Sequence, residues 1–314
     1  MQPFDAEATR AALPLDRLIP ALRAAFAAEA QVPPRHVHTI AQGGEAQGTV
    51  LIMPAWNEAF LGIKTINIFP GNGARGLPGL HATYVLYDAA TGVPLALLDG
   101  NEITARRTAG AAALGADFLA RQDARRLLVL GTGRVARLLP EAMRCVRPGI
   151  EEIAVWNHRP GGAEALAAQW RAAGLPARAA ADLEAAVRAA DIVSCATLAT
   201  APLVRGAWLA EGSHLDLIGS FTPQMKEADA ASFGGGARVY VDTEEALLKA
   251  GDLLDAIAAG SFRADAVQGT LAQLCRGERA GRGSARERTV FKAVGSALED
   301  LAAATLAWTA RAAA

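Results

Sequence analysis

Three cationic side chains in the first 110 residues are suited to hold a carboxylate. Lys64 lies in the apolar run LGIKTINIF, Arg35 follows a Pro-Pro pair in VPPRHVH, and Arg107 follows ALLDGNEIT. A guanidinium binds a carboxylate through two parallel hydrogen bonds, and an ammonium can donate a proton. The three residues therefore indicate a site for a small carboxylate. The alternation of the strand also allows the simpler interpretation that Lys64 is exposed on its outer face.

A second group of residues has the form of a dinucleotide-binding turn. The segment fits G-x-G-x-x-A and lies between the apolar run RLLVL and the helical pattern RLLPEAM. In such a turn the first glycine allows a tight bend and the second lets the backbone approach a pyrophosphate, which rests on the helix N-terminus. A plain strand-to-helix turn is the alternative. The residues concerned are Gly131, Thr132, Gly133, Arg134, Val135 and Ala136.

The end of the next strand bears on which dinucleotide binds. An acidic residue there would accept hydrogen bonds from the ribose 2′-hydroxyl of NAD, but the chain reads Trp156-Asn157-His158-Arg159. A guanidinium at this place can pair with a 2′-phosphate. The sequence thus predicts NADPH in preference to NADH, against the alternative that Arg159 is only a solvated loop residue.

Composition and charge limit the class of protein. Of 314 residues, 52% are hydrophobic and 20% charged, and the net charge is −1, so no basic field attracts nucleic acid or a membrane surface. Three distant cysteines indicate reduced thiols. No apolar run reaches the roughly 18 residues of a membrane span, and no signal peptide or metal-ligand cluster is recognisable. We expect a soluble cytoplasmic protein of about two domains, without a metal, that binds neither nucleic acid nor membranes.

The N-terminal part is predicted to be a mainly antiparallel α+β domain. Residues 15–29 place five apolar side chains on one helical face, and a further alanine-rich helix starts at Asn101. Between them, strand patterns follow one another with no helical pattern in between, at 49–53, 60–69, 82–88 and 94–99.

From Arg126 the pattern changes to strand–helix alternation, which predicts a parallel sheet covered on both faces. Further strands are expected at 153–157, 191–197, 213–220 and 237–242, and one long helix at 286–312. The predicted fold class is α/β: a Rossmann doubly wound parallel sheet domain inserted in an α+β domain. The expected division is 1–122, 123–284 and 285–314, the last being a helix that returns to the N-terminal domain.

Several motifs in collinear order closely resemble the ornithine cyclodeaminase/mu-crystallin family. They are LGIKTINIFPGN, LALLDGNEITARRTAG, LVLGTGRVA, LIGSFTPQMKEAD and FKAVGSALEDLAAA. The resemblance implies a homodimer with an N-terminal dimerisation and substrate domain. It also implies that Arg35, Lys64 and Arg107 hold and polarise the substrate carboxylate and its imine carbon. Glu299 and Asp300, in the last motif, are assigned to packing between domains.

One departure separates the activities of this family. Its cyclodeaminases carry an aspartate just after a glycine pair, where Phe221 stands in the segment IGSFTP. A benzyl group cannot move a proton. This form resembles the branch that reduces Δ1-pyrroline-2-carboxylate and Δ1-piperideine-2-carboxylate.

The predicted function is therefore the NADPH-dependent reduction of cyclic ketimines, giving L-proline or L-pipecolate. Three alternatives stay open: ornithine cyclodeamination, an alanine-type amino-acid dehydrogenase, and a binding protein that holds NADPH and a small ligand without turnover. The cofactor-binding residues expected besides the glycine turn are Thr108, Asn157, His158, Arg159, Cys195, Ala196, Thr197, Ile218 and Gly219, with Cys195 near the nicotinamide.

Overall fold

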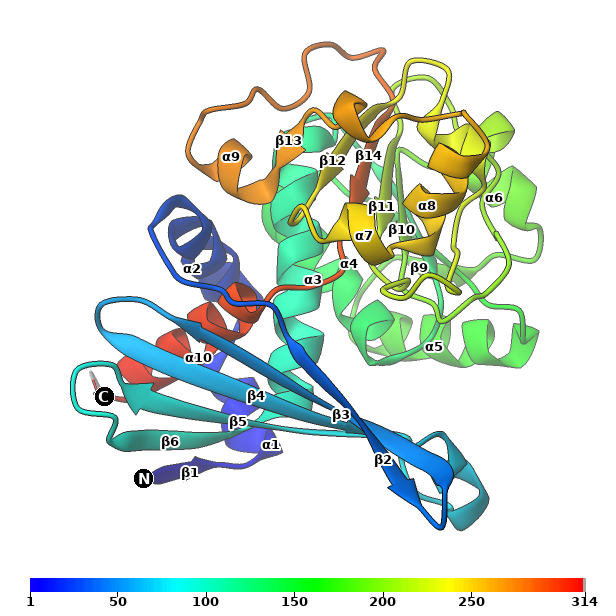
Figure 1. Ribbon diagram of the computed structural model, residues 1–314. Helices are drawn as coiled ribbons and strands as arrows, with labels where there is room; N and C mark the ends of the chain where they lie inside the picture. Colours follow the sequence, from blue (N-terminus) through cyan, green and yellow to red (C-terminus); the bar gives the residue numbers. More distant parts are fainter. Residues whose placement is uncertain (313–314) are drawn as a thin grey trace. The chain divides into compact units, whose positions relative to one another are not determined.

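The structure, a computed structural model, describes residues 1–312 and contains two compact units (Figure 1). The first unit combines Met1–Arg107 with the segment that starts at Ser296, and the second is Thr108–Gly295. The boundary between these units lies inside α3 (Gly100–Leu119), a helix that continues from one unit into the other.

The first unit contains a six-stranded sheet in the order β1-β6-β5-β4-β3-β2. All neighbours are antiparallel except β1 and β6. Four of these strands match the predicted ones. The strand β2 was missed because every position in it is exposed, so that no apolar alternation marks it. The strands are β1 (Gln2–Phe4), β2 (His36–Gln42), β3 (Glu45–Trp56), β4 (Phe60–Ile68), β5 (Leu80–Asp88) and β6 (Pro94–Asp99).

One face of this sheet is covered by helices. The last helix, α10 (Ala297–Ala312), packs on β3, β4 and β5 and lies beside α2 (Leu15–Ala27), as Figure 1 shows in red and blue. A short helix, α1 (Ala6–Ala12), contacts α10 as well. The residues that α2 buries are those of the predicted face: Leu15, Leu18, Ile19, Leu22 and Phe26.

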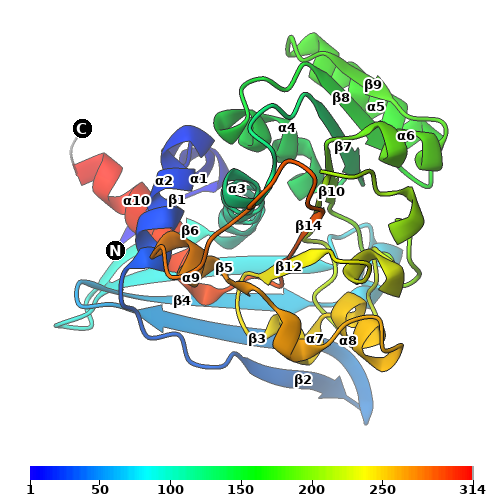
Figure 2. The same ribbon diagram turned by 90° about the horizontal axis from the view of Figure 1, so that it is seen from above.

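The second unit is a doubly wound parallel sheet in the order β13-β12-β14-β11-β10-β7-β8-β9 (Figure 2). The winding reverses between β7 and β10, the kind of point at which α/β sheets bind ligands beyond the carboxyl ends of the strands. The strands are β7 (Arg126–Leu130), β8 (Glu152–Trp156), β9 (Ala177–Ala179), β10 (Ile192–Cys195), β11 (His214–Leu217), β12 (Arg238–Val241), β13 (Gly269–Thr270) and β14 (Thr289–Lys292).

The connections between these strands are helical or irregular. The helices are α4 (Arg134–Val146), α5 (Pro160–Ala172), α6 (Leu183–Ala189), α7 (Ala246–Lys249), α8 (Gly251–Ala258) and α9 (Leu271–Cys275). Short 3-10 helices occur at η1 (Pro70–Arg75), which belongs to the first unit, and at η2 (Gly206–Trp208), η3 (Ala230–Phe233) and η4 (Ala264–Ala266).

The prediction of one helix over 286–312 was wrong. Residues 289–292 form β14, which lies between β11 and β12 and is buried at all four positions. The sequence TVFK suits a strand that is covered on both faces, because β-branched and aromatic side chains pack well on a pleated surface. Gly295 then adopts a φ of 78°, which a helix does not allow, and α10 begins only at Ala297.

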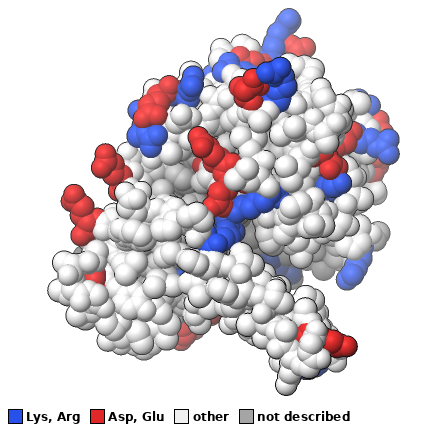
Figure 3. Space-filling model, viewed as in Figure 1, with Lys and Arg blue, Asp and Glu red and all other residues white. Residues whose placement is uncertain are grey.

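On the face shown in Figure 3 most of the surface is uncharged; small groups of acidic and basic side chains are scattered over it, and Lys and Arg side chains gather near the middle of the view. Among residues 1–312, no helix has both the length and the apolar character that a bilayer span requires.

The C-terminal end of α3 is held by one buried arginine of the second unit. Arg147, only 1% exposed, follows α4 and donates from Nη2 to the carbonyl oxygens of Ala116, Asp117 and Ala120, at 2.8 to 2.9 Å. Its Nε donates to the carbonyl of Arg121 at 2.8 Å, and Nη1 pairs with the Asp117 carboxylate at 2.9 Å. The last carbonyls of a helix have no partner within it, and this guanidinium satisfies those of Asp117 and Ala120, while Phe118 and Leu119 accept from Arg282.

Replacing Arg147 should therefore destabilise the protein without touching a predicted site. We expect Arg147→Met to lower the free energy of unfolding by about 3 kcal/mol or more, because several buried carbonyls lose their donor. Urea denaturation followed by circular dichroism measures the change. Arg144→Met, an exposed position on α4, is the matched control and should change stability by less than about 0.5 kcal/mol. Equal denaturation midpoints for the two variants would contradict this account.

Candidate cofactor and substrate sites

The glycine turn between β7 and α4 has the backbone that a pyrophosphate site requires. Gly131 has a φ of 107°, and a Cβ there would lie 2.6 Å from the carbonyl oxygen of Ala196, so only glycine fits. Gly133 precedes α4, and a Cβ at this position would meet nothing within 4 Å. No side chain caps the helix, so its first N–H groups are available to an anion. The turn fits the phosphates of a dinucleotide.

The strands beside this turn contribute the other predicted cofactor residues. Ala196 and Thr197 follow β10, and the backbone N–H of Ile218 donates to the carbonyl of Cys195 at 3.0 Å. The thiol of Cys195 is fully buried in the apolar core of the second unit, where burial raises its pKa well above the usual value. Its side chain is therefore a core group, neither a nucleophile nor exposed toward the crevice.

The residues predicted to select the cofactor lie between β8 and α5. Asn157 is half-buried, and its Nδ2 donates to the carbonyl of Arg159 at 3.3 Å. His158 and Arg159 are exposed, and Arg159 immediately precedes α5. Among residues 1–312 no carboxylate forms an ion pair with Arg159, so its guanidinium can approach a phosphate.

In the first unit, two predicted site residues are brought together by a buried charge cluster. Lys64 is fully buried on β4, and its Nζ lies 2.6 Å from Oδ2 of Asp300. Arg107 donates from Nε to Oδ1 of Asp300 at 2.9 Å and from Nη1 to Oε2 of Glu299 at 2.7 Å. Two cations thus face two carboxylates in a region almost closed to water. The interpretation of Lys64 as an exposed residue is wrong.

Glu299 and Asp300 have a different role from the predicted one. They lie in the first turn of α10 and pair with cations of their own unit, so their assignment to packing between domains missed their partners. The motif FKAVGSALED could have predicted these ion pairs, because an acidic pair in an otherwise apolar helix needs a counter-charge when it is buried.

Sequence reasoning also missed Tyr84, the residue opposite Lys64 on β5. Its hydroxyl is fully buried and makes no hydrogen bond within residues 1–312. A Cβ at Gly62 would lie 1.7 Å from this oxygen, so glycine is required there. Burial and the nearby charge of Asp300 raise the pKa of Tyr84 well above its usual value. The phenol stays neutral and can act as a hydrogen-bond donor beside Lys64.

The pKa of Lys64 is set by opposing effects. Burial lowers it, the carboxylate of Asp300 raises it, and the guanidinium of Arg107 lowers it again, which leaves a value of about 8. Burial also acts to lower the pKa of Arg107, but Asp300 and Glu299 outweigh this effect and raise it. Lys64 is therefore an ammonium at neutral pH that can release its proton far more easily than an exposed lysine.

Arg35, the third predicted cation, is half-buried and immediately precedes β2. In the sheet, His36 lies opposite Ile52, while Met53 lies opposite Lys64. Arg35 therefore precedes a strand that β3 separates from β4, the strand of Lys64.

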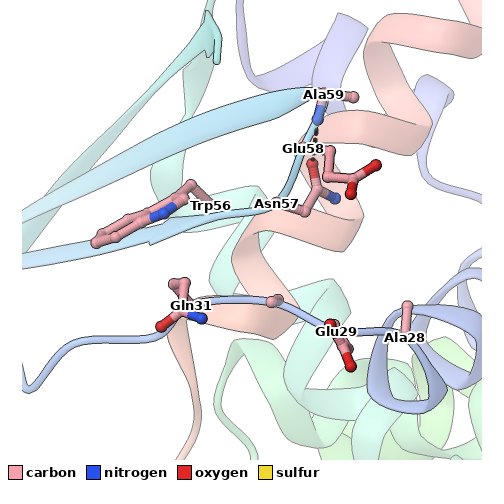
Figure 4. A pocket seen from close by; sticks show the side chains of 8 residues that line it. Ala28, Glu29, Gln31, Trp56, Asn57, Glu58 and Ala59 are labelled. Atoms are coloured by element: carbon pink, nitrogen blue, oxygen red, sulfur yellow. Dashed lines mark hydrogen bonds between the residues drawn. The ribbon is translucent and has the colours of Figure 1, made fainter. Parts of the chain in front are cut away.

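A pocket of about 620 Å³ at the end of this sheet is a separate feature (Figure 4). It is lined by Glu29, Glu58 and Trp56 among others, but by none of the three predicted cations. Asn57, also in its wall, accepts hydrogen bonds from the backbone N–H groups of Ala59 and Phe60, and so forms a turn. With two acidic residues, this pocket is unsuited to a carboxylate ligand.

The doubly wound sheet, with its glycine turn at the switch point, defines a protein of the Rossmann-type dinucleotide-fold class. Residues 5–311 match the model of the ornithine cyclodeaminase/mu-crystallin family, and the chain belongs to this family. The resemblance drawn from the sequence motifs and the predicted fold class are both confirmed.

Known proteins resemble this chain along nearly its whole length. A Δ1-pyrroline-2-carboxylate reductase of Paracoccus denitrificans is 41% identical over 276 residues, covering 85% of this chain and 87% of the relative. The structure of the Thermococcus litoralis Δ1-pyrroline-2-carboxylate reductase in complex with NADH and L-proline has a TM-score of 0.91 at 30% identity, covering 98% of this chain and 97% of the other. An archaeal alanine dehydrogenase dimer with bound NAD also has a TM-score of 0.91, at 28% identity, covering 100% and 96%.

The charge cluster makes a direct prediction about Lys64. In Asp300→Asn, burial still disfavours the ammonium but its counter-charge is gone, so the pKa of Lys64 should fall from about 8 by at least about 1. NMR titration of isotope-labelled lysine measures it, and the chain has only four lysines to assign. Lys226, which pairs with Asp255 instead, is the internal control. An unaltered Lys64 titration would show that Asp300 does not sustain its charge.

Proposed function

We propose that this protein reduces cyclic ketimine carboxylates with a nicotinamide cofactor, converting Δ1-pyrroline-2-carboxylate to L-proline and Δ1-piperideine-2-carboxylate to L-pipecolate. The class of enzyme, an oxidoreductase acting on C=N bonds, is that of the curated relatives named Δ1-pyrroline-2-carboxylate reductase. The observation that carries the proposal is the buried Lys64 ammonium, held beside Arg107 by two carboxylates of α10.

Charge balance explains why three cations are needed. Lys64 and Arg107 are already matched by Glu299 and Asp300, so a substrate carboxylate would leave this region with excess negative charge. Arg35 supplies the additional positive charge, and we assign it to the carboxylate together with Arg107. Fixed guanidinium groups restrict the orientation of a small planar ring far more than a single point charge would.

Lys64 is the proposed proton source. Its lowered pKa keeps the proton available at neutral pH, and an iminium accepts hydride more readily than a neutral imine. A bound nicotinamide supplies the hydride. Because Lys64 is held by Asp300 on one side and lies 3.4 Å from Oγ1 of Thr104 on another, the ammonium has a fixed position.

For the cofactor, we propose NADPH in preference to NADH. The support is the exposed Arg159 and the absence of an acidic residue at Asn157. The similar Thermococcus litoralis and archaeal structures contain NADH and NAD, respectively, so the preference rests on the residues of this chain alone. We also assign dimerisation and substrate binding to the first unit, and a cytoplasmic location on the basis of three free thiols.

An alanine-type dehydrogenase is the second candidate, favoured by the likeness to the archaeal enzyme. Ornithine cyclodeamination is disfavoured because Phe221 packs against the apolar core of the second unit and offers no proton-transferring group. A non-catalytic binding protein is disfavoured because nothing in mere binding calls for a buried lysine with a pKa of about 8.

A substrate panel distinguishes these activities. We expect NADPH oxidation with the five- or six-membered ring imine, and little or none with pyruvate and ammonia. L-Ornithine with NAD should release no ammonia. Absorbance at the nicotinamide band and an ammonia assay measure the outcomes. Ornithine deamination as fast as imine reduction would contradict the interpretation of Phe221, and faster turnover of pyruvate would favour the dehydrogenase.

The cofactor preference depends on Arg159. Arg159→Ala should raise the KM for NADPH by about tenfold or more and leave NADH little changed, since a charge-assisted contact contributes about 1.5–3 kcal/mol. Steady-state kinetics with both cofactors measures this. Arg171→Ala, at the other end of α5, is the matched control. Equal use of NADH and NADPH by the unmodified protein would contradict the proposed preference.

A further inference from the structure

A single buried carboxylate joins the two loops that follow β10 and β11. Glu227 is fully buried, and its Oε1 accepts hydrogen bonds from the backbone N–H of Thr197 at 2.7 Å and from its hydroxyl at 2.8 Å. Its Oε2 accepts from the N–H of Gly219 at 2.8 Å and of Ser220 at 3.2 Å. Four donors from two loops thus converge on one side chain.

The two loops are in very close contact at this point. A Cβ at Gly219 would lie 2.1 Å from the carbonyl oxygen of Thr197 and 2.4 Å from Oε1 of Glu227, so only glycine allows the approach. Thr197 in turn adjoins the glycine turn, because a Cβ at Gly131 would lie 3.3 Å from its Cγ2 and 2.6 Å from the carbonyl of Ala196. A shift of Glu227 would therefore be passed to the turn itself.

The position of Glu227 is fixed in turn by a second buried carboxylate, that of Asp252. The carboxylate of Asp252, on α8, accepts from the backbone N–H of Glu227 at 2.6 Å and also from the hydroxyl of Ser220. Lys292, at the end of β14, lies 3.1 Å from Oδ2 of Asp252 and 2.5 Å from Oγ of Ser220. Glu227, Ser220, Asp252 and Lys292, here called the clamp network, are all fully buried.

We propose that Glu227 is a positioning residue of the dinucleotide site, whose carboxylate fixes the loops after β10 and β11 against the glycine turn so that they can receive the nicotinamide end of the cofactor. The inference deepens the proposed function, since it rests on the dinucleotide site, but it is independent of the imine substrate. Proximity supports the assignment to this end, because both loops leave the carboxyl ends of strands next to the switch point.

All four hydrogen bonds to Glu227 in the clamp network can form only when its carboxyl group is ionised. A carboxylate accepts hydrogen bonds at both oxygens, whereas a protonated acid places an O–H against one of the four donors. Burial and Asp252 raise the pKa of Glu227, while Lys292 and the Thr197 hydrogen bonds lower it, and the result is about 7. Asp216 and Cys195 are the other titratable groups near it.

Affinity and stability should therefore respond to pH in opposite directions. Cofactor affinity should rise as pH increases through 7, because ionised Glu227 then accepts all four hydrogen bonds of the clamp network. The contribution of Glu227 to folding stability should instead decrease as pH rises. Its folded pKa lies above its ordinary value of 4.5, so that contribution is present below 4.5 and is lost as pH rises through 7. A residue needed only for folding would not produce this opposition.

The test is Glu227→Gln, which keeps the size of the side chain but presents an NH₂ group to two of the four donors. We expect NADH and NADPH, measured by fluorescence titration without substrate at pH 8, to bind about tenfold more weakly or worse. A pH series with NADH, which lacks a titrating 2′-phosphate, should show affinity rising through pH 7 in the unmodified protein and no such rise in the variant.

Asp229→Asn is the matched control. The Asp229 carboxylate accepts from the N–H of Gly206 at 2.8 Å and from the N–H and hydroxyl of Ser232 at 3.1 and 3.0 Å, but it holds the loops of η2 and η3 instead. The Asp229→Asn substitution should change cofactor affinity by less than about twofold, even if it lowers thermal stability as much as Glu227→Gln does.

If Glu227→Gln does not fold, Thr197→Val removes one donor without burying a new polar group, and should weaken cofactor binding by about threefold. The proposal is overturned if the folded variant of either residue binds cofactor as the unmodified protein does, or if Glu227→Gln and Asp229→Asn weaken binding equally. Failure of the unmodified protein to bind either nucleotide would instead refute the proposed function.

Discussion

The first unit depends on the pairing of Lys64 and Arg107 with Glu299 and Asp300. Arg107 and Asp300 are 193 residues apart, so this pairing ties the last helix of the chain to its N-terminal sheet. Removing one member of a buried ion pair leaves an uncompensated charge, which typically costs about 3–5 kcal/mol. Arg107 is consequently both an anchor of α10 and a proposed substrate contact, and a loss of activity on its replacement cannot be assigned to the substrate without a measurement of stability.

The second unit uses buried polar groups differently. Its sheet carries the buried Lys292, and four buried acids lie in the neighbourhood of this lysine: Asp216, Glu227, Asp242 and Asp252. Glu227, Asp242 and Asp252 accept mainly from backbone N–H groups, such as those of Val294 and Gly295 on Asp242. Carboxylates that accept from main-chain groups fix loop conformation directly, because each hydrogen bond constrains backbone instead of a long side chain.

The sequence predicted those elements whose cause is local. The apolar face of α2 follows from spacing within 15 residues, and Gly131 and Gly133 could be interpreted because a strand and a helix flank them. The strand–helix alternation from Arg126 predicted the doubly wound parallel sheet, and the family resemblance agreed with it. The predictions that failed concern segments whose structure depends on residues far away in the sequence. The segment TVFK is a strand only because β11 and β12 lie on either side of it, and an alanine-rich segment that follows it favours a helix in isolation. Likewise, no spacing rule connects Asp300 to Lys64 or Glu227 to Thr197.

The position of β14 has a consequence for how the chain is made. The strand is the last of the sheet to leave the ribosome, yet β12 reaches the rest of the sheet only through it. Until residues 289–292 emerge, β11 is an open edge, and β12 with β13 forms a detached pair that exposes backbone able to join other chains. At synthesis rates of about 5–20 residues per second, most of the polypeptide must persist for many seconds without a completed sheet. We therefore expect chaperones to protect nascent chains of this protein until residues 289–292 are available.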